Sequence, residues 1–249
     1  MGTKIEWVRS PDGSAGETWN PVTGCTPISS GCTHCYAKRL AEGRLRGRFG
    51  YDANEPFKVT VHNDKWLQPF EWKKPKSVFV CSMGDLFHQD VPDWVINKIM
   101  VDCANWAYHG HVFFFLTKRP ERMVQFFSEL VPHPNIYLGV TVENELLMPR
   151  IDTLLHLSVK WKKFVSVEPM LGPVPIPMDV IGKLDWVICG GEKGKKAREC
   201  NAFWMMDLLS RCVAQRANYF FKQPGDNFKG SIDDLIYLAK HRAMPWDRA

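Results

Sequence analysis

The clearest pattern along the chain is an alternation of short apolar runs with longer segments in which apolar residues recur at helical spacing. The runs have strand length and are almost continuously apolar, which is typical of parallel strands covered on both faces. We expect strands within residues 17–23, 77–82, 111–117, 136–142, 163–167, 185–189 and 219–221. Seven such runs, separated by helical segments, predict about seven βα units.

The segments between these runs predict helices. After Pro92, apolar side chains recur every three or four residues as far as Ala107. Pro120 stands where a proline opens a helix, and Asn201 is suited to cap a helix over residues 202–217. The predicted strands are therefore separated by helical segments.

This alternation predicts an α/β fold built as one domain over residues 1–249. We expect a partial or complete TIM-like (β/α) barrel, and a doubly wound open sheet is the alternative architecture. In both architectures the site lies at the carboxyl ends of the strands.

Composition places the chain among ordinary globular proteins, with 45% apolar and 24% charged residues in 249. No apolar run reaches the length of a membrane span, and the first residues lack an apolar signal core. We therefore expect a cytoplasmic protein without a membrane partner. The net charge of +5 permits contact with a polyanion but does not argue for one.

Residues 24–36 hold three cysteines, Cys25, Cys32 and Cys35, in the pattern C-x6-C-x2-C. Glycine and proline interrupt regular structure here, so the loop can aim several thiols at one point. Thiolates select iron–sulfur clusters or zinc, and three ligands leave one open position on a four-iron cluster or a catalytic zinc. The alternatives are a structural zinc completed by His34 or by a remote ligand, a disulfide, and inert thiols.

The other five cysteines are scattered rather than clustered: Cys81, Cys103, Cys189, Cys200 and Cys212. All but Cys200 lie in largely apolar surroundings, where a cysteine behaves as a small apolar residue. We expect core packing and not a disulfide framework.

Polar residues gather where the predicted strands end. Besides the cysteine loop, they are Ser82, Gly84, Asp85, Thr117, Lys118, Arg119, Glu143, Glu168, Glu192, Lys222 and Gln223. If the strands are parallel, these ends point into one basin. Two alternatives are structural: Asp85 could cap the following turn, and Glu168 could form an ion pair with Lys118 or Arg119. The basic run 193–198 fits either a solvated surface or a phosphate contact.

A family resemblance extends over nearly the whole chain. It is carried by residues 4–7, 18–25, 31–37, 82–88, 116–123, 138–143, 167–173, 185–192 and 220–223. In these stretches the chain resembles phage- and prophage-associated proteins related to radical SAM enzymes. A phage-encoded member would work in the host cytoplasm.

The resemblance implies a [4Fe–4S] cluster on Cys25, Cys32 and Cys35, with S-adenosylmethionine (SAM) bound to the open iron through its amino and carboxylate groups. Radical SAM enzymes more often have C-x3-C-x2-C, so the first interval here is three residues longer. Tyr36 stands where such enzymes place an aromatic residue near the adenine. Asp85 would pair with the SAM ammonium.

The cofactor side implied by the resemblance is Tyr36, Ser82, Gly84, Asp85, Thr117 and Glu143. The implied reaction is reductive cleavage of SAM to methionine and a 5′-deoxyadenosyl radical, which takes a hydrogen from the substrate. An external electron donor is required. Candidates for the substrate side are Lys118, Arg119, Glu168, Glu192, Lys222 and Gln223.

Lysine and arginine suit an anionic group, so a nucleotide, DNA or RNA base is the expected substrate. The alternative is a non-enzymatic iron–sulfur or zinc module that binds nucleic acid. A further alternative is a SAM binder that transfers methyl groups without radicals. The strand-end carboxylates favour the enzyme, because a polyanion binder has little use for them.

Overall fold

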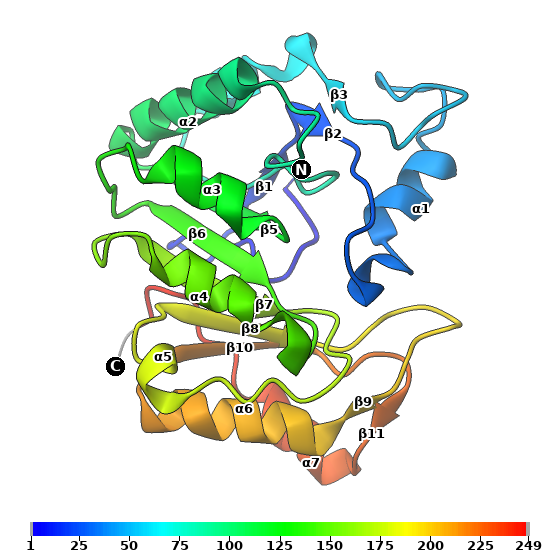
Figure 1. Cartoon of the computed structure of the whole chain (residues 1–249), viewed down its shortest axis with the longest axis vertical. Helices are drawn as coiled ribbons and strands as arrows, with labels where there is room; N and C mark the ends of the chain where they lie inside the picture. Colours follow the sequence, from blue (N-terminus) through cyan, green and yellow to red (C-terminus); the bar gives the residue numbers. More distant parts are fainter. Residues whose placement is uncertain (1, 248–249) are drawn as a thin grey trace. The chain divides into compact units, whose positions relative to one another are not determined.

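The computed structural model describes residues 2–247, and the chain divides into two compact units, Met1–Tyr137 and Leu138–Ala249. Both units combine parallel strands with covering helices (Figure 1). The strands at residues 77–80, 112–117, 136–141, 162–167 and 186–190 are buried along almost their whole length, because both of their faces are covered. The predicted α/β alternation is therefore confirmed in each unit.

In the first unit, three strands lie side by side in the order β1-β4-β5, all parallel. The strands of this unit are β1 (Glu17–Trp19), β2 (Val22–Thr23), β3 (Thr60–Val61), β4 (Ser77–Val80) and β5 (Val112–Thr117), and β6 (Ile136–Thr141) begins at its end. Glu17 is opposite Val78, and Ser77 is opposite Val112. The short strands β2 and β3 form an antiparallel pair.

The helices of the first unit are α1 (Tyr36–Glu42), α2 (Asp93–Tyr108) and α3 (Pro120–Phe127), with 3-10 turns η1 (Ser30–Cys32), η2 (Asn63–Lys65) and η3 (Gln68–Glu71). Figure 1 shows α2 and α3 in front of the strands. The apolar stripe predicted for α2 is buried from Ile96 to Ala107. The first helix is shorter than the helical spacing of residues 36–48 suggests, because it ends at Glu42 before Gly43.

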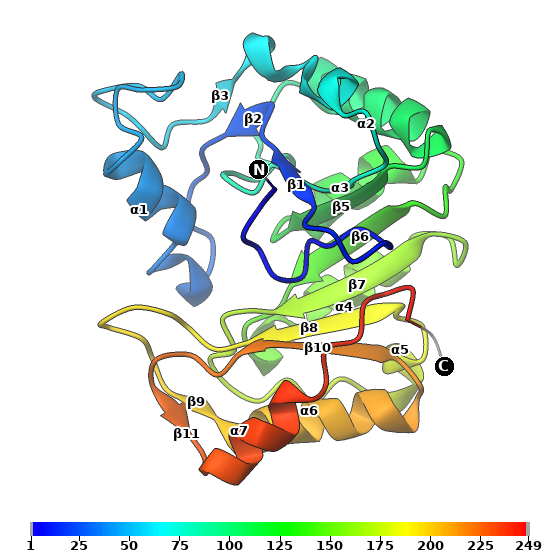
Figure 2. The same cartoon turned by 180° about the vertical axis from the view of Figure 1, so that it is seen from behind.

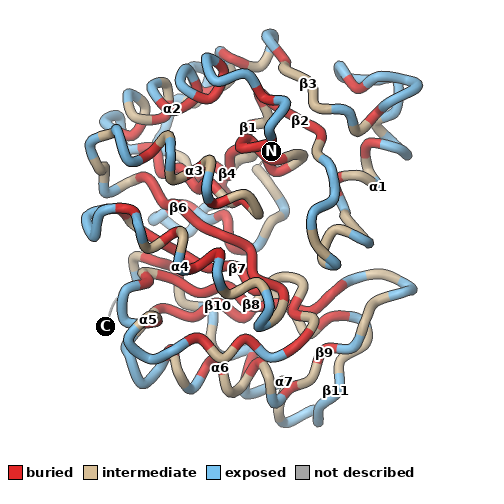
Figure 3. The backbone as a smooth tube through the Cα atoms, viewed as in Figure 1, coloured by how far each residue is buried: buried red, intermediate tan, exposed pale blue. Residues whose placement is uncertain are grey.

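The second unit has the strand order β6-β7-β8-β10, and β7, β8 and β10 are parallel neighbours. Its strands are β7 (Lys162–Val167), β8 (Trp186–Gly190), β9 (Cys200–Asn201), β10 (Asn218–Gln223) and β11 (Phe228–Lys229). Its helices are η4 (Glu145–Leu147), α4 (Pro149–Leu155), α5 (Met178–Ile181), α6 (Ala202–Ala214) and α7 (Ile232–Ala239). Figure 3 shows β7 and β8 as largely buried segments.

Helix ends in the second unit follow local chemistry. The Asn201 side chain accepts the Phe203 N–H at 2.9 Å, which confirms the predicted cap of α6. Sequence analysis missed α7, although Ser231 and Asp234 form a reciprocal capping box at its start. Pro149 is the first residue of α4, where proline is favourable because its missing N–H needs no partner.

Across the residues described, no helix combines the length and the apolar character needed to span a membrane.

Candidate functional site

The cysteine loop of the first unit is joined at its start to the segment that follows β4. The Gly24 N–H donates to the Met83 carbonyl at 3.0 Å, and Gly24 forms an isolated parallel bridge with Gly84. Gly24 has φ of +87°, and a Cβ there would lie 2.1 Å from the Lys58 carbonyl oxygen. Only glycine fits this close approach, so the start of the loop is fixed against the end of a core strand.

The segment after β4 is anchored by an aromatic side chain. Phe87 is buried, and its ring centroid lies 6.5 Å from that of Phe115 on β5 and 6.3 Å from that of Phe127 on α3. Burying a phenylalanine stabilises the fold by about 1.5–3 kcal/mol. The polar residues on either side of Phe87, Asp85 and His88, are thereby held in place.

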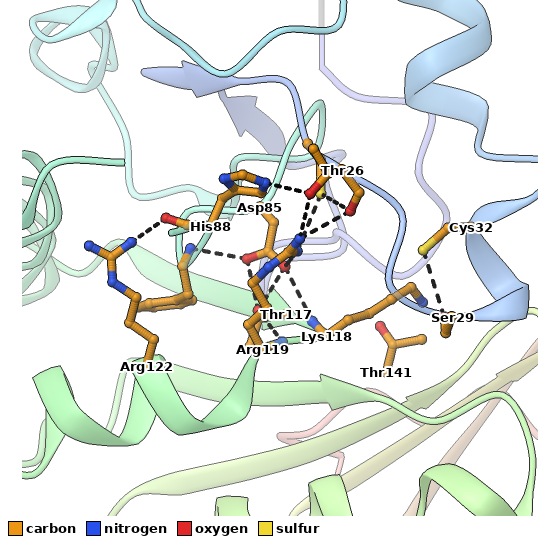
Figure 4. Close-up of polar contacts among 12 residues, drawn as sticks. Thr26, Ser29, Cys32, Asp85, His88, Thr117, Lys118, Arg119, Arg122 and Thr141 are labelled. Atoms are coloured by element: carbon orange, nitrogen blue, oxygen red, sulfur yellow. Dashed lines mark hydrogen bonds and ion pairs between the residues drawn. The ribbon is translucent and has the colours of Figure 1, made fainter. Parts of the chain in front are cut away.

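Asp85 is the centre of the polar cluster, as Figure 4 shows. Its buried carboxylate accepts hydrogen bonds from Thr117 Oγ1 at 2.8 and 2.9 Å and from Arg119 Nη1 at 3.1 Å. The backbone N–H groups of Lys118 and Phe87 donate to it as well, at 3.3 and 3.0 Å. Asp85 thus caps its own turn, as the structural alternative held, and also binds the end of β5.

Arg119 links this carboxylate to the cysteine loop. Its Nη1 lies 3.4 Å from Cys25 Sγ, and its Nη2 donates to the carbonyl and hydroxyl oxygens of Thr26 at 3.0 and 3.2 Å. Burial, with the Asp85 carboxylate, raises the pKa of Cys25 to about 11, although Arg119 opposes this. Sequence analysis assigned Arg119 to the substrate side, and the structure places it between Asp85 and the loop.

His88 completes the cluster and was not singled out from the sequence. Its side chain is buried, and its Nδ1 accepts the Asp90 N–H at 3.1 Å. The ring proton is therefore on Nε2, which donates to Thr26 Oγ1 at 2.7 Å. Burial and the charge of Arg119 lower the pKa of His88, so the ring is neutral at pH 7. Its place in the resembling stretch 82–88 was the one available signal.

Arg122 supports the same loop from the first turns of α3. It donates to the carbonyl oxygens of His88 and Val91, the latter at 2.7 Å, and pairs with Asp93 at the start of α2. The loop between β4 and α2 is thus tied to α3 by one guanidinium (Figure 4).

Tyr36 and Ser82 lie together beside the start of α1. The Tyr36 hydroxyl donates to the Ser82 carbonyl, and Ser82 Oγ donates to Asn20 Oδ1 at 3.2 Å. Asn20 Oδ1 also accepts the Met83 N–H at 2.9 Å. Tyr36 is 47% exposed, so part of its side chain is accessible to solvent. Asn20 is a further residue that sequence analysis did not single out.

The three loop cysteines are half-buried, whereas the other five cysteines are buried. Burial raises the pKa of Cys81, Cys200 and Cys212 to about 12 and that of Cys103 and Cys189 well above the ordinary thiol value. Their expected role in core packing is confirmed.

Cys32 differs from all of these. Burial alone would raise its pKa, but hydrogen bonding at Ile28 and Ser29 and the charge of Lys118 lower it below the ordinary thiol value. Ser29 Oγ lies 3.7 Å from Cys32 Sγ. In residues 2–247, no group of three His, Cys, Asp or Glu side chains is placed to hold a metal ion. The three thiols share one loop, and their role as metal ligands stays a prediction.

In the second unit, Glu143 and Glu168 each have a basic partner. Glu143 is fully buried, and its Oε2 accepts from Arg150 Nη1 at 2.9 Å. Glu168 pairs with Lys222 and accepts from Gln223 Nε2 at 3.4 Å. From the sequence, Lys118 or Arg119 was a candidate ion-pair partner of Glu168. In the structure the partner of Glu168 is Lys222, at the end of β10.

Glu192, which follows β8, is paired in the same way. Its Oε2 accepts from the backbone N–H and Nε of Arg198, at 2.9 and 3.0 Å. Lys193 pairs with Asp226 at 2.9 Å. Lys193 and Arg198, two members of the basic run 193–198, thus form local ion pairs. A solvated surface explains these two residues without a bound phosphate.

Comparison with known proteins gives one family. A family model described as "Protein of unknown function (DUF5131)" matches residues 2–243. No curated protein and no solved structure matches the chain.

Proposed function

We propose that this chain, which belongs to the family described as a protein of unknown function (DUF5131), is a radical SAM-type enzyme acting on a nucleotide or a nucleic-acid base. The proposal includes a [4Fe–4S] cluster on Cys25, Cys32 and Cys35, SAM as cofactor, and a partial TIM-like barrel as the architecture. It rests on the resemblance of the sequence and on the geometry of the first unit.

The observation that carries the proposal is the partition of the thiols. Three are accessible and lie in one loop, while five are buried in the core. Thiolate donors are the ligands of iron–sulfur clusters, and a set of three leaves an open iron. The donor set therefore fits a cluster, and the lowered pKa of Cys32 favours the ligating thiolate form.

When bound, the cluster and SAM would supply one-electron cleavage of SAM and hydrogen abstraction. The chain would supply recognition of the methionyl group, which carries an ammonium and a carboxylate. Asp85 and Arg119 place opposite charges 3.1 Å apart beside Cys25. The Asp85 carboxylate can therefore bind the ammonium of SAM, and the Arg119 guanidinium can bind the carboxylate of SAM. Lys118 would add positive charge for a phosphate.

One observation favours the alternative of a non-enzymatic metal module that binds nucleic acid. Asp85, Glu143, Glu168 and Glu192 each have a basic side chain as partner. Carboxylates in such pairs also serve structural ends, so they do not by themselves indicate catalysis. The assignment of Glu143, Glu168, Glu192, Lys222 and Gln223 to cofactor or substrate stays a prediction.

Electron paramagnetic resonance of the anaerobically reconstituted, dithionite-reduced protein tests the proposal. We expect a reduced-cluster signal that changes when SAM is added, and its loss in Cys32→Ala. Cys212→Ala is the matched control, because Cys212 is a buried thiol on α6. A cluster signal indifferent to SAM would overturn the radical reaction and support the binding module. Stoichiometric zinc in place of iron would overturn the cluster.

A further inference from the structure

The second unit has a hollow at the amino end of β10, opposite the end that holds Lys222 and Gln223. Its volume is about 420 Å³, and its lining comes from the end of α6, the start of β10 and the segment after α7. Figure 2 shows this last segment in red, running back along β10. The hollow is thus distinct from every residue assigned above to metal, cofactor or substrate.

One lining residue has an unused donor. Asn218, the first residue of β10, is 9% exposed, and its Nδ2 is buried without a hydrogen-bond partner. Among the side chains described, Ser77 Oγ is the other buried polar atom in this state. A buried amide donor without an acceptor costs free energy, so Asn218 marks a place where an acceptor oxygen would be favourable.

The segment after α7 contributes basic residues to the lining. Lys240, His241 and Arg242 follow one another in the lining, and no Asp or Glu belongs to it among the residues described. Backbone hydrogen bonds hold this segment to the strand: the Phe221 N–H donates to the His241 carbonyl at 2.7 Å, and Arg242 forms an antiparallel bridge with Phe220. The basic side chains therefore extend from a segment whose backbone is held in place by hydrogen bonds.

The part of the lining that comes from α6 is apolar. Leu209 and Val213 from α6, with Ala217 after it, line the hollow, and Val213 is 59% exposed. A volume of this size is that of a site for a small organic molecule. The lining thus combines an amide side chain, cations and apolar surface.

We propose that this hollow binds a small organic anion whose oxyanion faces Lys240 and Arg242 and accepts from Asn218 Nδ2 after that side chain turns toward the hollow. Its apolar body would lie against Val213 and Ala217. The oxyanion can be a phosphate ester or a carboxylate, since both present acceptor oxygens and negative charge. This site does not depend on the cysteine loop.

Isothermal titration calorimetry on the full chain tests the proposal, with phenyl phosphate, benzoate and inorganic phosphate as probes. We expect saturable binding of phenyl phosphate or benzoate, and the stronger of the two identifies the oxyanion. Inorganic phosphate binds more weakly because it lacks the apolar body. Asn218→Asp keeps the side-chain size but turns the donor into a repelling carboxylate, so the Kd rises about tenfold or more.

Arg242→Gln should weaken binding, and Lys196→Gln is the matched control, with the same loss of charge at a position outside the lining. An equal effect in both variants would reduce the site to general charge attraction and overturn the proposal. So would the absence of saturable binding of every probe.

Asn218→Leu gives a second readout: without ligand it should unfold at the same or a higher temperature, because an unpartnered donor is removed. A clear loss of stability would assign Asn218 a structural role instead and overturn its role as a free donor.

Discussion

Arg119 Nη1 donates to Asp85 Oδ2 at 3.1 Å, and both side chains are largely removed from solvent. The pair joins the carboxyl end of β5 to the segment after β4, and through Thr26 it reaches the cysteine loop. Three segments far apart in the sequence therefore depend on one guanidinium.

Removing that guanidinium should destabilise the first unit. Arg119→Ala leaves the Asp85 carboxylate buried without its cation, and we expect a loss of about 2–4 kcal/mol in the free energy of unfolding. Urea denaturation measures this. Arg44→Ala, at an exposed position on the same unit, is the control and should change stability by less than about 0.5 kcal/mol. An equal loss of unfolding free energy in Arg119→Ala and Arg44→Ala would show that the ion pair between Arg119 and Asp85 does not stabilise the fold.

The pair of Glu143 and Arg150 gives a sharper case, because Glu143 is completely buried. Arg150→Met should cost about 3–5 kcal/mol, since the carboxylate keeps its burial and loses its charge partner. Lys183→Met breaks an exposed pair with Asp179 and should cost less than about 0.5 kcal/mol. Thermal unfolding compares the two, and a small effect of Arg150→Met would mean that Glu143 becomes protonated or hydrated at little cost.

Close packing at the start of the cysteine loop can be tested with two glycines of similar φ. Gly13 has φ of +80°, and a Cβ added there would meet only open space, whereas at Gly24 it would meet a backbone oxygen. Gly13→Ala should cost about 1–2 kcal/mol from backbone strain alone. Gly24→Ala should cost about 1–3 kcal/mol more, because the loop must shift. Chemical denaturation measures both, and comparable losses would contradict the close approach of Gly24 to Lys58.

Alkylation of the thiols should follow their pKa values. The thiolate is the reactive form, so the rate of each thiol rises as the pH approaches its pKa. Cys32, with a lowered pKa, should react first with iodoacetamide near neutral pH, and Cys25, with a pKa of about 11, should react only in alkali. Mass spectrometry of the metal-free protein gives the order. Faster labelling of Cys25 would contradict it.

His88 should make the stability depend on pH. Its pKa is lowered in the folded protein by burial and by Arg119, so the unfolded chain binds the proton more readily. The stabilisation from the neutral ring is complete above pH 6.5, the ordinary histidine value, and falls as the pH drops below it, by at most about 1.4 kcal/mol per pH unit. In His88→Gln the slope of stability against pH, measured by urea denaturation between pH 6.5 and 5, should be smaller. An unchanged slope would assign the pH dependence to His62, His111 and His133, whose pKa values are also lowered by burial.

The fold could be predicted where the spacing of apolar residues agrees with the positions of prolines at helix starts. The apolar runs correspond to β4 through β8, and the prolines before α2 and at the start of α3 marked where those helices begin. The helix α7 was missed because it follows no long apolar strand, although its capping box is visible in the sequence. The helical spacing of residues 36–48 continues past the end of α1, because spacing does not register the break at Gly43.

The sequence predicted which residues belong to the site, but not which of them contact one another. Asp85, Thr117 and Arg119 were all singled out at strand ends, and they do contact one another. Thr26 and His88 were not, because a threonine and a lone histidine have no spacing that marks them. Which cation meets which carboxylate depends on side-chain directions that the sequence does not contain, as Lys222 at Glu168 illustrates.

The partition of the thiols also determines how the protein ages in air. Oxidants attack thiolates that solvent can reach, so sulfenic acids and mixed disulfides should form in the cysteine loop while the core cysteines stay reduced. Such damage leaves the packing of both units intact. A preparation kept aerobically would therefore look well folded by circular dichroism and yet have lost Cys32 as a cluster ligand, which makes a thiol count a better measure of its quality than its melting curve.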